Sequence, residues 1–161
     1  MPPPSAFEVL KKFYHMKVTS VAKMDINKIP FVVSGAHLID VLKIIGKYRH
    51  VWVVESKETM HLIGIVTEYD ILKFLSELRP SEYSLGGAKP VSYLAAEIVD
   101  DVMTRQLIVA TPEEYIKDAL NKMRRYKIRY LPIVDESRTL LGELTLHEII
   151  LKFGNLLSGI I

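Results

Sequence analysis

An internal repeat constrains this chain more than any other feature of its sequence. The stretch Gly64-Ile65-Val66-Thr67-Glu68-Tyr69-Asp70 returns as Gly142-Glu143-Leu144-Thr145-Leu146-His147-Glu148, and each residue lies 78 positions before its counterpart. In both copies a threonine follows an apolar run, and an acidic residue stands three positions later, which is the spacing of a helix capping box. We therefore expect one strand-to-helix junction to occur twice in the fold.

The repeat extends to the elements that precede this junction. The helical apolar pattern of Leu38, Val41, Leu42 and Ile45 recurs as Ile116, Ala119, Leu120 and Met123 at the same offset of 78. The continuous apolar run at residues 51–54, typical of a strand buried on both faces, recurs at 131–134 with an offset of 80. With further strands at 31–33, 62–66 and 107–109, the repeat unit is predicted as strand, helix, strand, strand, helix.

Local signals predict where the helices begin and end. We expect Ser34 to cap the helix of residues 38–45 and Gly46 to end it, and we expect Thr111-Pro112-Glu113-Glu114 to start its counterpart. The helix after Thr67 is expected to bury one apolar stripe, formed by Ile71, Leu72, Leu75 and Leu78. A short helix at 6–15 is expected to dock by the face that carries Phe7, Leu10 and Tyr14.

The sequence predicts a mixed α/β (α+β) chain of two β-α-β-β-α repeats that pack with pseudo-two-fold symmetry. The N-terminal segment covers residues 1–28 and the first repeat covers 29–80. A linker with a connecting helix at 91–103 occupies 81–103, and the second repeat with its tail covers 104–161.

Composition excludes several classes of function. The chain has no cysteine, and its 21 basic and 19 acidic residues give a net charge of only +2, which argues against a purely electrostatic nucleic-acid partner. The five histidines share no metal-ligand spacing, and no nucleophile or glycine-rich phosphate-loop signature is present, so neither a metal nor an enzyme is predicted. With no run of about 18 apolar residues and no signal-peptide pattern, a cytoplasmic protein is expected.

The repeated residues resemble the CBS domain. The resemblance rests on Leu131-Pro132-Ile133-Val134-Asp135 followed by Gly142-x-x-Thr145, and on Gly64-Ile65-Val66-Thr67-x-x-Asp70 in the first repeat. It spans roughly residues 29–153, so the chain looks like a tandem CBS pair, or Bateman module, of the stand-alone type frequent in archaea. No catalytic domain is expected outside it.

The resemblance implies a regulatory site for AMP, ADP, ATP or S-adenosylmethionine in clefts between the repeats. It also implies a homodimer formed through the CBS helices and a regulated protein in trans. In the family, the acidic residue of the motif holds ribose, the threonine holds phosphate or ribose, and basic residues before the central strand face phosphate.

Carried onto this sequence, the resemblance gives one complete site and one altered site. The ribose and phosphate ligands of the first site are Thr67, Asp70, Arg49 and His50, and its adenine pocket is Ile29, Pro30, Phe31, Ile65 and Val66. The second site would use Thr145, Glu148, Lys127, Arg129, Tyr130, Leu107, Ile108 and Val109. There Glu148 replaces the expected aspartate, and Glu143 adds negative charge where the first copy has Ile65.

Other interpretations of the same residues stay open. Thr67 and Asp70 could simply cap a helix and bind nothing. Arg49 and Arg129 could be exposed charges, and the apolar candidates could be ordinary core residues. The chain as a whole could be a ligand-free dimerisation module. The basic run of residues 122–130, in which Arg124, Arg125, Lys127 and Arg129 alternate with aromatic residues, could bind nucleic acid, although we favour a solvated helix end.

Overall fold

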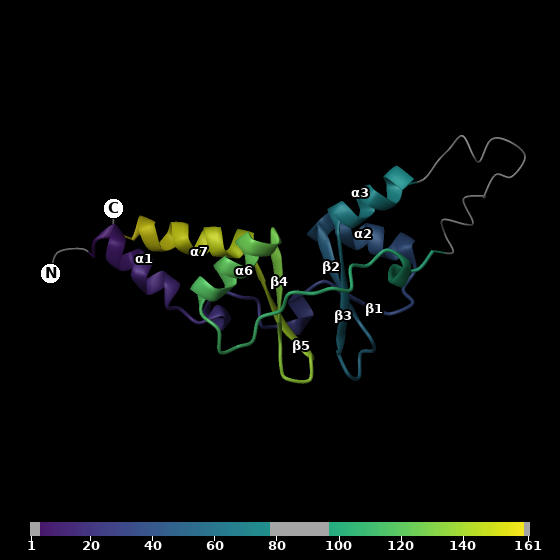
Figure 1. Cartoon of the computed structure of the whole chain (residues 1–161), viewed down its shortest axis with the longest axis horizontal. Coiled ribbons are helices and arrows are strands. Elements are labelled where there is room, and N and C mark those ends of the chain that lie inside the picture. The colour runs from purple at the N-terminus through teal and green to yellow at the C-terminus, as the bar shows by residue number, and fades with distance from the viewer. Residues whose placement is uncertain (1–3, 78–96, 160–161) are drawn as a thin grey trace, which may run out of the picture. The chain divides into compact units, whose positions relative to one another are not determined.

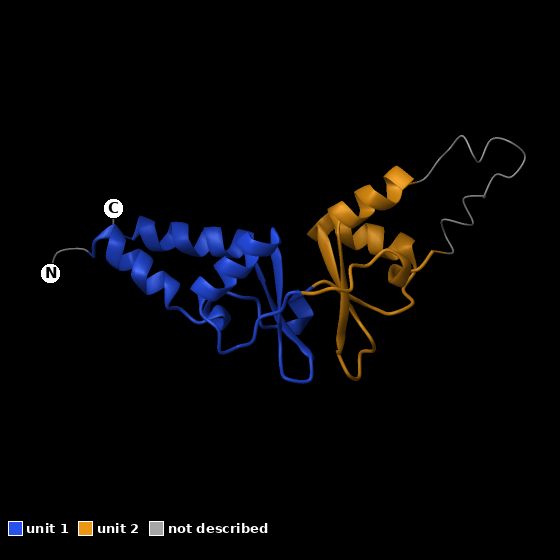
Figure 2. Cartoon of the chain, viewed as in Figure 1, with its two compact units in different colours: residues 1–29, 108–161 blue, residues 30–107 orange. Residues whose placement is uncertain are grey.

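The first junction lies in a unit built from the middle of the chain, and the second lies in a unit built from its two ends (Figure 2). The computed structural model describes residues 4–77 and 97–159. Unit 1 takes residues 1–29 and 108–161, and unit 2 takes residues 30–107. The mixed helix and strand architecture agrees with the predicted α+β repeats.

Unit 2 carries a three-stranded sheet in the order β1-β2-β3 (Figure 1). Strand β1 (Phe31–Val33) is parallel to β2 (His50–Val54), and β3 (Leu62–Thr67) is antiparallel to β2. Every residue of β2 is buried, as its continuous apolar run predicts. Helix α2 (Leu38–Tyr48) joins β1 to β2, and α3 (Glu68–Glu77) follows β3 directly. A 3₁₀ turn, η3 (Val99–Asp101), begins the segment that closes the unit.

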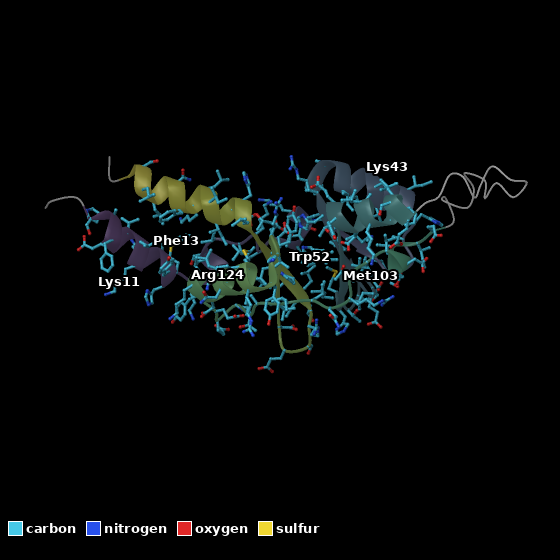
Figure 3. The ribbon with its side chains drawn as sticks, turned by 45° about the horizontal axis from the view of Figure 1, so that its top comes forward. Lys11, Phe13, Lys43, Trp52, Met103 and Arg124 are labelled. Carbon is cyan, nitrogen blue, oxygen red and sulfur yellow. The ribbon has the colours of Figure 1, made fainter. Side chains whose placement is uncertain are left out.

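Unit 1 repeats the hairpin and its two helices. Strands β4 (Tyr130–Val134) and β5 (Leu140–Thr145) are antiparallel, with α6 (Ile116–Tyr126) before them and α7 (Leu146–Ser158) after them. Helix α1 (Ala6–Tyr14) lies beside α7, and two 3₁₀ turns follow it, η1 (Val18–Ser20) and η2 (Ile26–Lys28) (Figure 1). The ring of Phe13, labelled in Figure 3, packs 5.1 Å from that of Phe153 in α7.

The strand predicted at residues 107–109 is not formed, because Pro132 lacks a backbone donor. In unit 2 the equivalent ladder includes a hydrogen bond of 3.0 Å from the Trp52 N–H to the Pro30 carbonyl. Pro132 is two residues into β4, as Trp52 is in β2, and proline has no N–H to donate. Only an isolated parallel bridge between Ala110 and Ile133 remains.

A two-residue insertion explains why the central strands repeat at 80 rather than 78. In unit 2, Arg49 ends α2 in the left-handed conformation (φ 70°), and its carbonyl also accepts the N–H of Glu68 at 3.3 Å. In unit 1, Lys127 ends α6 (φ 54°), whereas the carbonyl of Arg129 accepts the N–H of Leu146 at 2.9 Å. In unit 1, Lys127 thus ends the helix in the left-handed conformation and Arg129 accepts the first N–H of the next helix, whereas Arg49 does both in unit 2.

Each repeat is completed by the segment that precedes the other repeat in the sequence. Lys23, which precedes the first repeat, exchanges two backbone hydrogen bonds of 2.9 Å with Glu143 of β5 in unit 1. Thr104, which precedes the second, does the same with Ile65 of β3 in unit 2, at 2.8 and 3.0 Å.

These exchanged segments account for the glycines of the repeated motif. A Cβ on Gly64 would lie 2.4 Å from the sulfur of Met103, and a Cβ on Gly142 would lie 2.6 Å from both the Met24 sulfur and the Lys23 carbonyl oxygen. Only glycine lets the segment approach the strand this closely. Figure 3 labels Met103 and Trp52 in the interior of unit 2, where they are 8% and 0% exposed.

Several predicted helix boundaries are wrong. His37, not Ser34, is the N-cap of α2, and the Ser34 hydroxyl instead donates to Asp100 Oδ1 at 2.6 Å. Gly46 lies inside α2, which continues to Tyr48. The Thr111–Glu114 stretch forms a turn in which Glu114 accepts the N–H of Thr111, and α6 begins only at Ile116.

The predicted buried faces of two helices are also wrong. Helix α1 buries Val9 and Phe13, whereas Phe7 and Tyr14 are 73% and 39% exposed. In α3 no residue is fully buried, Leu72 and Leu75 are 60% and 55% exposed, and Ile71 and Phe74 pack partly against the core of unit 2. Of the connecting helix predicted at 91–103, residues 97–103 contain only η3, and residues 91–96, like Leu78 and the linker before them, lie outside the described residues.

Candidate functional site

Asp70 is the centre of the first junction. Helix α3 begins at Glu68, one residue after Thr67, so Asp70 lies in the first turn, where the positive end of the helix dipole favours a carboxylate. Its Oδ2 accepts the Thr67 N–H at 2.7 Å and the Thr67 hydroxyl at 2.9 Å. Thr67 and Asp70, singled out from their spacing, are therefore in direct contact.

A second hydroxyl, which the sequence reasoning missed, completes this arrangement. The Thr104 hydroxyl donates to Asp70 Oδ1 at 2.8 Å, across 34 residues of sequence. Both carboxylate oxygens of Asp70 thus accept a hydroxyl proton. The only signal in the sequence is that Met103 and Met24 precede the motif glycines by similar distances, and that pattern gives no hint that the segments are exchanged.

Arg49 lies next to the start of α3 and is exposed, whereas the side chain of His50 is buried. The Arg49 carbonyl accepts the first N–H of α3, and the Arg49 residue itself is exposed. His50 pairs with Thr67 across β2 and β3, but it is only 3% exposed and its Nδ1 lies 3.1 Å from the Tyr48 carbonyl oxygen. A phosphate at this junction would meet the guanidinium of Arg49 more readily than the imidazole.

The adenine candidates divide between the units. Pro30, Phe31, Ile65 and Val66 belong to unit 2, whereas Ile29 is the last residue of the N-terminal part of unit 1. Val66 is fully buried and Phe31 is half-buried. The N–H and the carbonyl of Ile65 are both bonded to Thr104, so this backbone position is already engaged.

The second junction forms a complete helix cap with an ion pair. Glu148 Oε2 accepts the Thr145 N–H at 2.9 Å, and the Thr145 hydroxyl accepts the Glu148 N–H at 3.2 Å. Lys23 Nζ lies 3.3 Å from Glu148 Oε1, and the Glu148 side chain is only 13% exposed. The predicted capping box is confirmed here, and its carboxylate already has a cation beside it.

The other residues proposed for the second site differ in burial and belong to both units. Lys127 and Arg129 are exposed, Tyr130 begins β4 half-buried, and Glu143 is buried in β5 at 1% exposure. Leu107 is the last residue of unit 2, whereas Ile108 and Val109 belong to unit 1 and are half-buried.

The basic run is shorter than its sequence suggests. The half-buried Lys122 ammonium bonds the Val109 carbonyl oxygen at 2.8 Å and pairs with Glu114, so it is engaged within unit 1. Arg124 and Arg125 are exposed, with the Arg125 guanidinium 5.6 Å from the Tyr126 ring centre. This is the solvated helix end that we favour.

Among residues 4–77 and 97–159, no three His, Cys, Asp or Glu side chains are grouped so that they could hold a metal ion. Within the same part of the chain, no helix has both the length and the apolar character needed to cross a bilayer.

Comparison with known proteins identifies the fold. A model of the CBS domain matches residues 18–77 and 99–155. The chain is 32% identical over 128 residues to inosine-5'-monophosphate dehydrogenase of Halalkalibacterium halodurans, covering 78% of this chain but 23% of that enzyme. It is also 32% identical over 146 residues to the uncharacterized protein MJ1426 of Methanocaldococcus jannaschii, covering 78% of this chain and 87% of MJ1426.

Solved structures give the same result at the level of the fold. The CBS domain pair of protein MJ0100, solved with 5'-methylthioadenosine and S-adenosyl-L-methionine, aligns with a TM-score of 0.65 at 24% identity, over 88% of this chain and 98% of that one. CBSX2 in complex with AMP aligns with a TM-score of 0.68 at 23% identity, over 86% and 96%. Protein MJ1225 of Methanocaldococcus jannaschii aligns with a TM-score of 0.72 at 21% identity, over 93% and 54%.

Proposed function

This chain belongs to the CBS domain family, and from that premise we propose that it is a regulatory module that binds an adenosine-containing ligand at its first junction. CBS pairs are regulatory rather than catalytic domains, and the enzymes that match this chain share only their CBS part with it. The ligand is AMP, ADP, ATP or S-adenosylmethionine, and no metal or other cofactor is required.

The observation that carries the proposal is the pair of hydroxyl groups on Asp70. A ribose presents two neighbouring hydroxyls, and a carboxylate accepts both, as acidic residues do in dinucleotide-binding folds. Thr67 and Thr104 place two hydroxyl protons on the two oxygens of Asp70. A ribose diol would present two hydroxyl donors of the same kind to these two carboxylate oxygens.

The similar structures support this ligand class. The MJ0100 pair was solved with two adenosyl compounds and CBSX2 with AMP, and all of these molecules contain a ribose 2',3'-diol. A phosphate on that ribose would be stabilised by the N-terminus of α3 and by the exposed Arg49 beside it.

Isothermal titration of the full chain with AMP, ADP, ATP and S-adenosylmethionine tests the proposal. The Asp70→Asn variant is expected to bind about 100-fold more weakly, because two hydrogen bonds to a charged acceptor, together worth about 3 kcal/mol, are reduced. Glu148→Gln is the matched control and is expected to leave this affinity unchanged. Equal binding by Asp70→Asn, or no binding of any of the four compounds at millimolar concentration, would refute the proposal.

A ligand series separates ribose recognition from phosphate recognition. 2'-Deoxy-AMP is expected to bind about tenfold more weakly than AMP, because one hydrogen bond to Asp70 is lost. Binding would regulate another protein by shifting the populations of two arrangements of the module, since a ligand acts only through its different affinities for two states.

A further inference from the structure

Thr104 and Lys23 occupy the same position in the two units. Each exchanges two backbone hydrogen bonds with the second residue of the repeated motif, Ile65 in unit 2 and Glu143 in unit 1. Ile65 and Glu143 are themselves 78 residues apart, at matching positions of the repeat. The two junctions can therefore be compared residue by residue at this position.

The two side chains contact the equivalent carboxylates of the two junctions, one with a hydroxyl and the other with an ammonium group. The Thr104 hydroxyl lies 2.8 Å from Asp70 Oδ1, and the Lys23 ammonium lies 3.3 Å from Glu148 Oε1. At the other carboxylate oxygen, Asp70 Oδ2 accepts the N–H and the hydroxyl of Thr67, whereas Glu148 Oε2 accepts the Thr145 N–H. The Thr145 hydroxyl instead accepts the Glu148 N–H. Asp70 thus holds two neutral hydroxyl donors, and Glu148 holds a cation.

This difference decides which ligand each carboxylate can accept. A ribose hydroxyl that replaces the Thr104 hydroxyl leaves the charge at Asp70 unchanged. Glu148 Oε1 is buried and makes no hydrogen bond among the described residues, but the Lys23 ammonium lies 3.3 Å from it. A ribose hydroxyl that moves this ammonium away removes the counter-charge of a carboxylate that is only 13% exposed, which is unfavourable.

We propose that the residue at this position determines whether a junction accepts a ribose diol, so that Thr104 leaves the first junction open and Lys23 closes the second. The chain then binds one nucleotide, at Asp70, and Lys23 is the residue that excludes a second. This inference rests on the proposed function and adds to it the number of sites and the residue that sets that number.

Titration calorimetry of the full chain with AMP tests the inference through stoichiometry. The wild type is expected to bind one AMP per chain. Lys23→Thr combined with Glu148→Asp, which gives unit 1 the residues of unit 2, is expected to bind two. Lys28→Thr, an exposed lysine of the same segment, is the matched control and is expected to bind one.

The reciprocal variant tests the same idea in unit 2. Thr104→Lys is expected to lose at least 90% of AMP binding, and Thr104→Ser to retain it, with circular dichroism confirming that each variant folds. A wild type that binds one AMP, together with a double variant that also binds one and a Thr104→Lys variant that still binds, would overturn the inference and leave the proposed function standing. A wild type that binds two would overturn the inference, and one that binds none would overturn both.

Discussion

Arg49 combines a structural cost with a position beside the first junction. Its left-handed backbone (φ 70°) is unfavourable for a residue with a Cβ by about 1 kcal/mol, and glycine relieves this cost at helix C-termini. Lys127 has the same backbone conformation (φ 54°) at the end of α6. Glycine substitutions at Arg49 and Lys127 should therefore give the same gain in stability, whereas only the substitution at Arg49 should weaken phosphate binding.

We expect Arg49→Gly to raise the free energy of unfolding by about 1 kcal/mol and to weaken AMP binding, while adenosine binding stays unchanged. Lys127→Gly should give a similar gain in stability without any change in AMP affinity. Chemical denaturation measures the first quantity and calorimetry the second. Full AMP affinity in Arg49→Gly would show that this guanidinium does not contact phosphate.

Asp100 makes part of the stability of unit 2 depend on pH. Burial tends to raise the pKa of its carboxyl, but hydrogen bonds from the Ser34 hydroxyl and the Gly35 N–H, both 2.6 Å, and the charge of Arg105 bring the pKa below its ordinary value of 3.8. Because the folded pKa lies below the unfolded one, the carboxylate stabilises the fold above pH 3.8. This stabilisation is lost as the pH falls through the folded pKa.

The difference in unfolding free energy between the wild type and Asp100→Asn is therefore expected to shrink between about pH 6 and about pH 3. Denaturant unfolding at a series of pH values measures it. Asp40→Asn, which removes an exposed carboxylate on α2, serves as the control. A difference that stays constant over this range would exclude the proposed role of the Asp100 charge.

At the scale of elements, the sequence correctly predicts the features that depend on residues close to one another in the chain. The cap formed by Thr145 and Glu148 and the fully buried β2 both follow from contacts or patterns within a few residues. The strand at 107–109 fails because its partner contains Pro132, a fact visible only once the two segments are paired. Ser34 fails as a helix start because its hydroxyl is bonded to Asp100, 66 residues away. The Thr111–Glu114 stretch forms a turn although Glu114 accepts the Thr111 N–H.

The candidate site divides in the same way. The contact of Thr67 with Asp70 follows from their spacing, whereas the contacts of Thr104 with Asp70 and of Lys23 with Glu148 join segments 34 and 125 residues apart. The spacing of apolar residues does not predict whether the segment around Lys23 or the segment around Thr104 packs against a given repeat. That choice depends on the whole fold.

At the scale of the whole molecule, α3 leaves an apolar stripe unburied. Tyr69, Leu72 and Leu75 follow one another at intervals of three along α3 and are 73%, 60% and 55% exposed. Exposed apolar stripes mark contact surfaces for another protein, a membrane or a ligand. We propose that a second copy of the chain covers this one, as the family resemblance implies.

We expect the wild type to be a dimer by light scattering at micromolar concentration, and Leu72→Glu with Leu75→Glu to be monomeric, because two charges would be buried without partners. Phe7→Glu, which changes an apolar residue on α1 that is even more exposed, should remain dimeric. A monomeric wild type, or a dimeric double variant, would argue against this interface.

The exchange of segments also sets an order of events during synthesis on the ribosome. Unit 2 is one continuous stretch, residues 30–107, and can fold as soon as it emerges, since domains generally fold as they are made. The first 29 residues emerge earlier but find their partners only in residues 108–161. Within the described part of the chain, the other buried residues of the core that contains Phe13 and Val18 all belong to residues 108–161, so the burial of these two side chains requires that part of the chain.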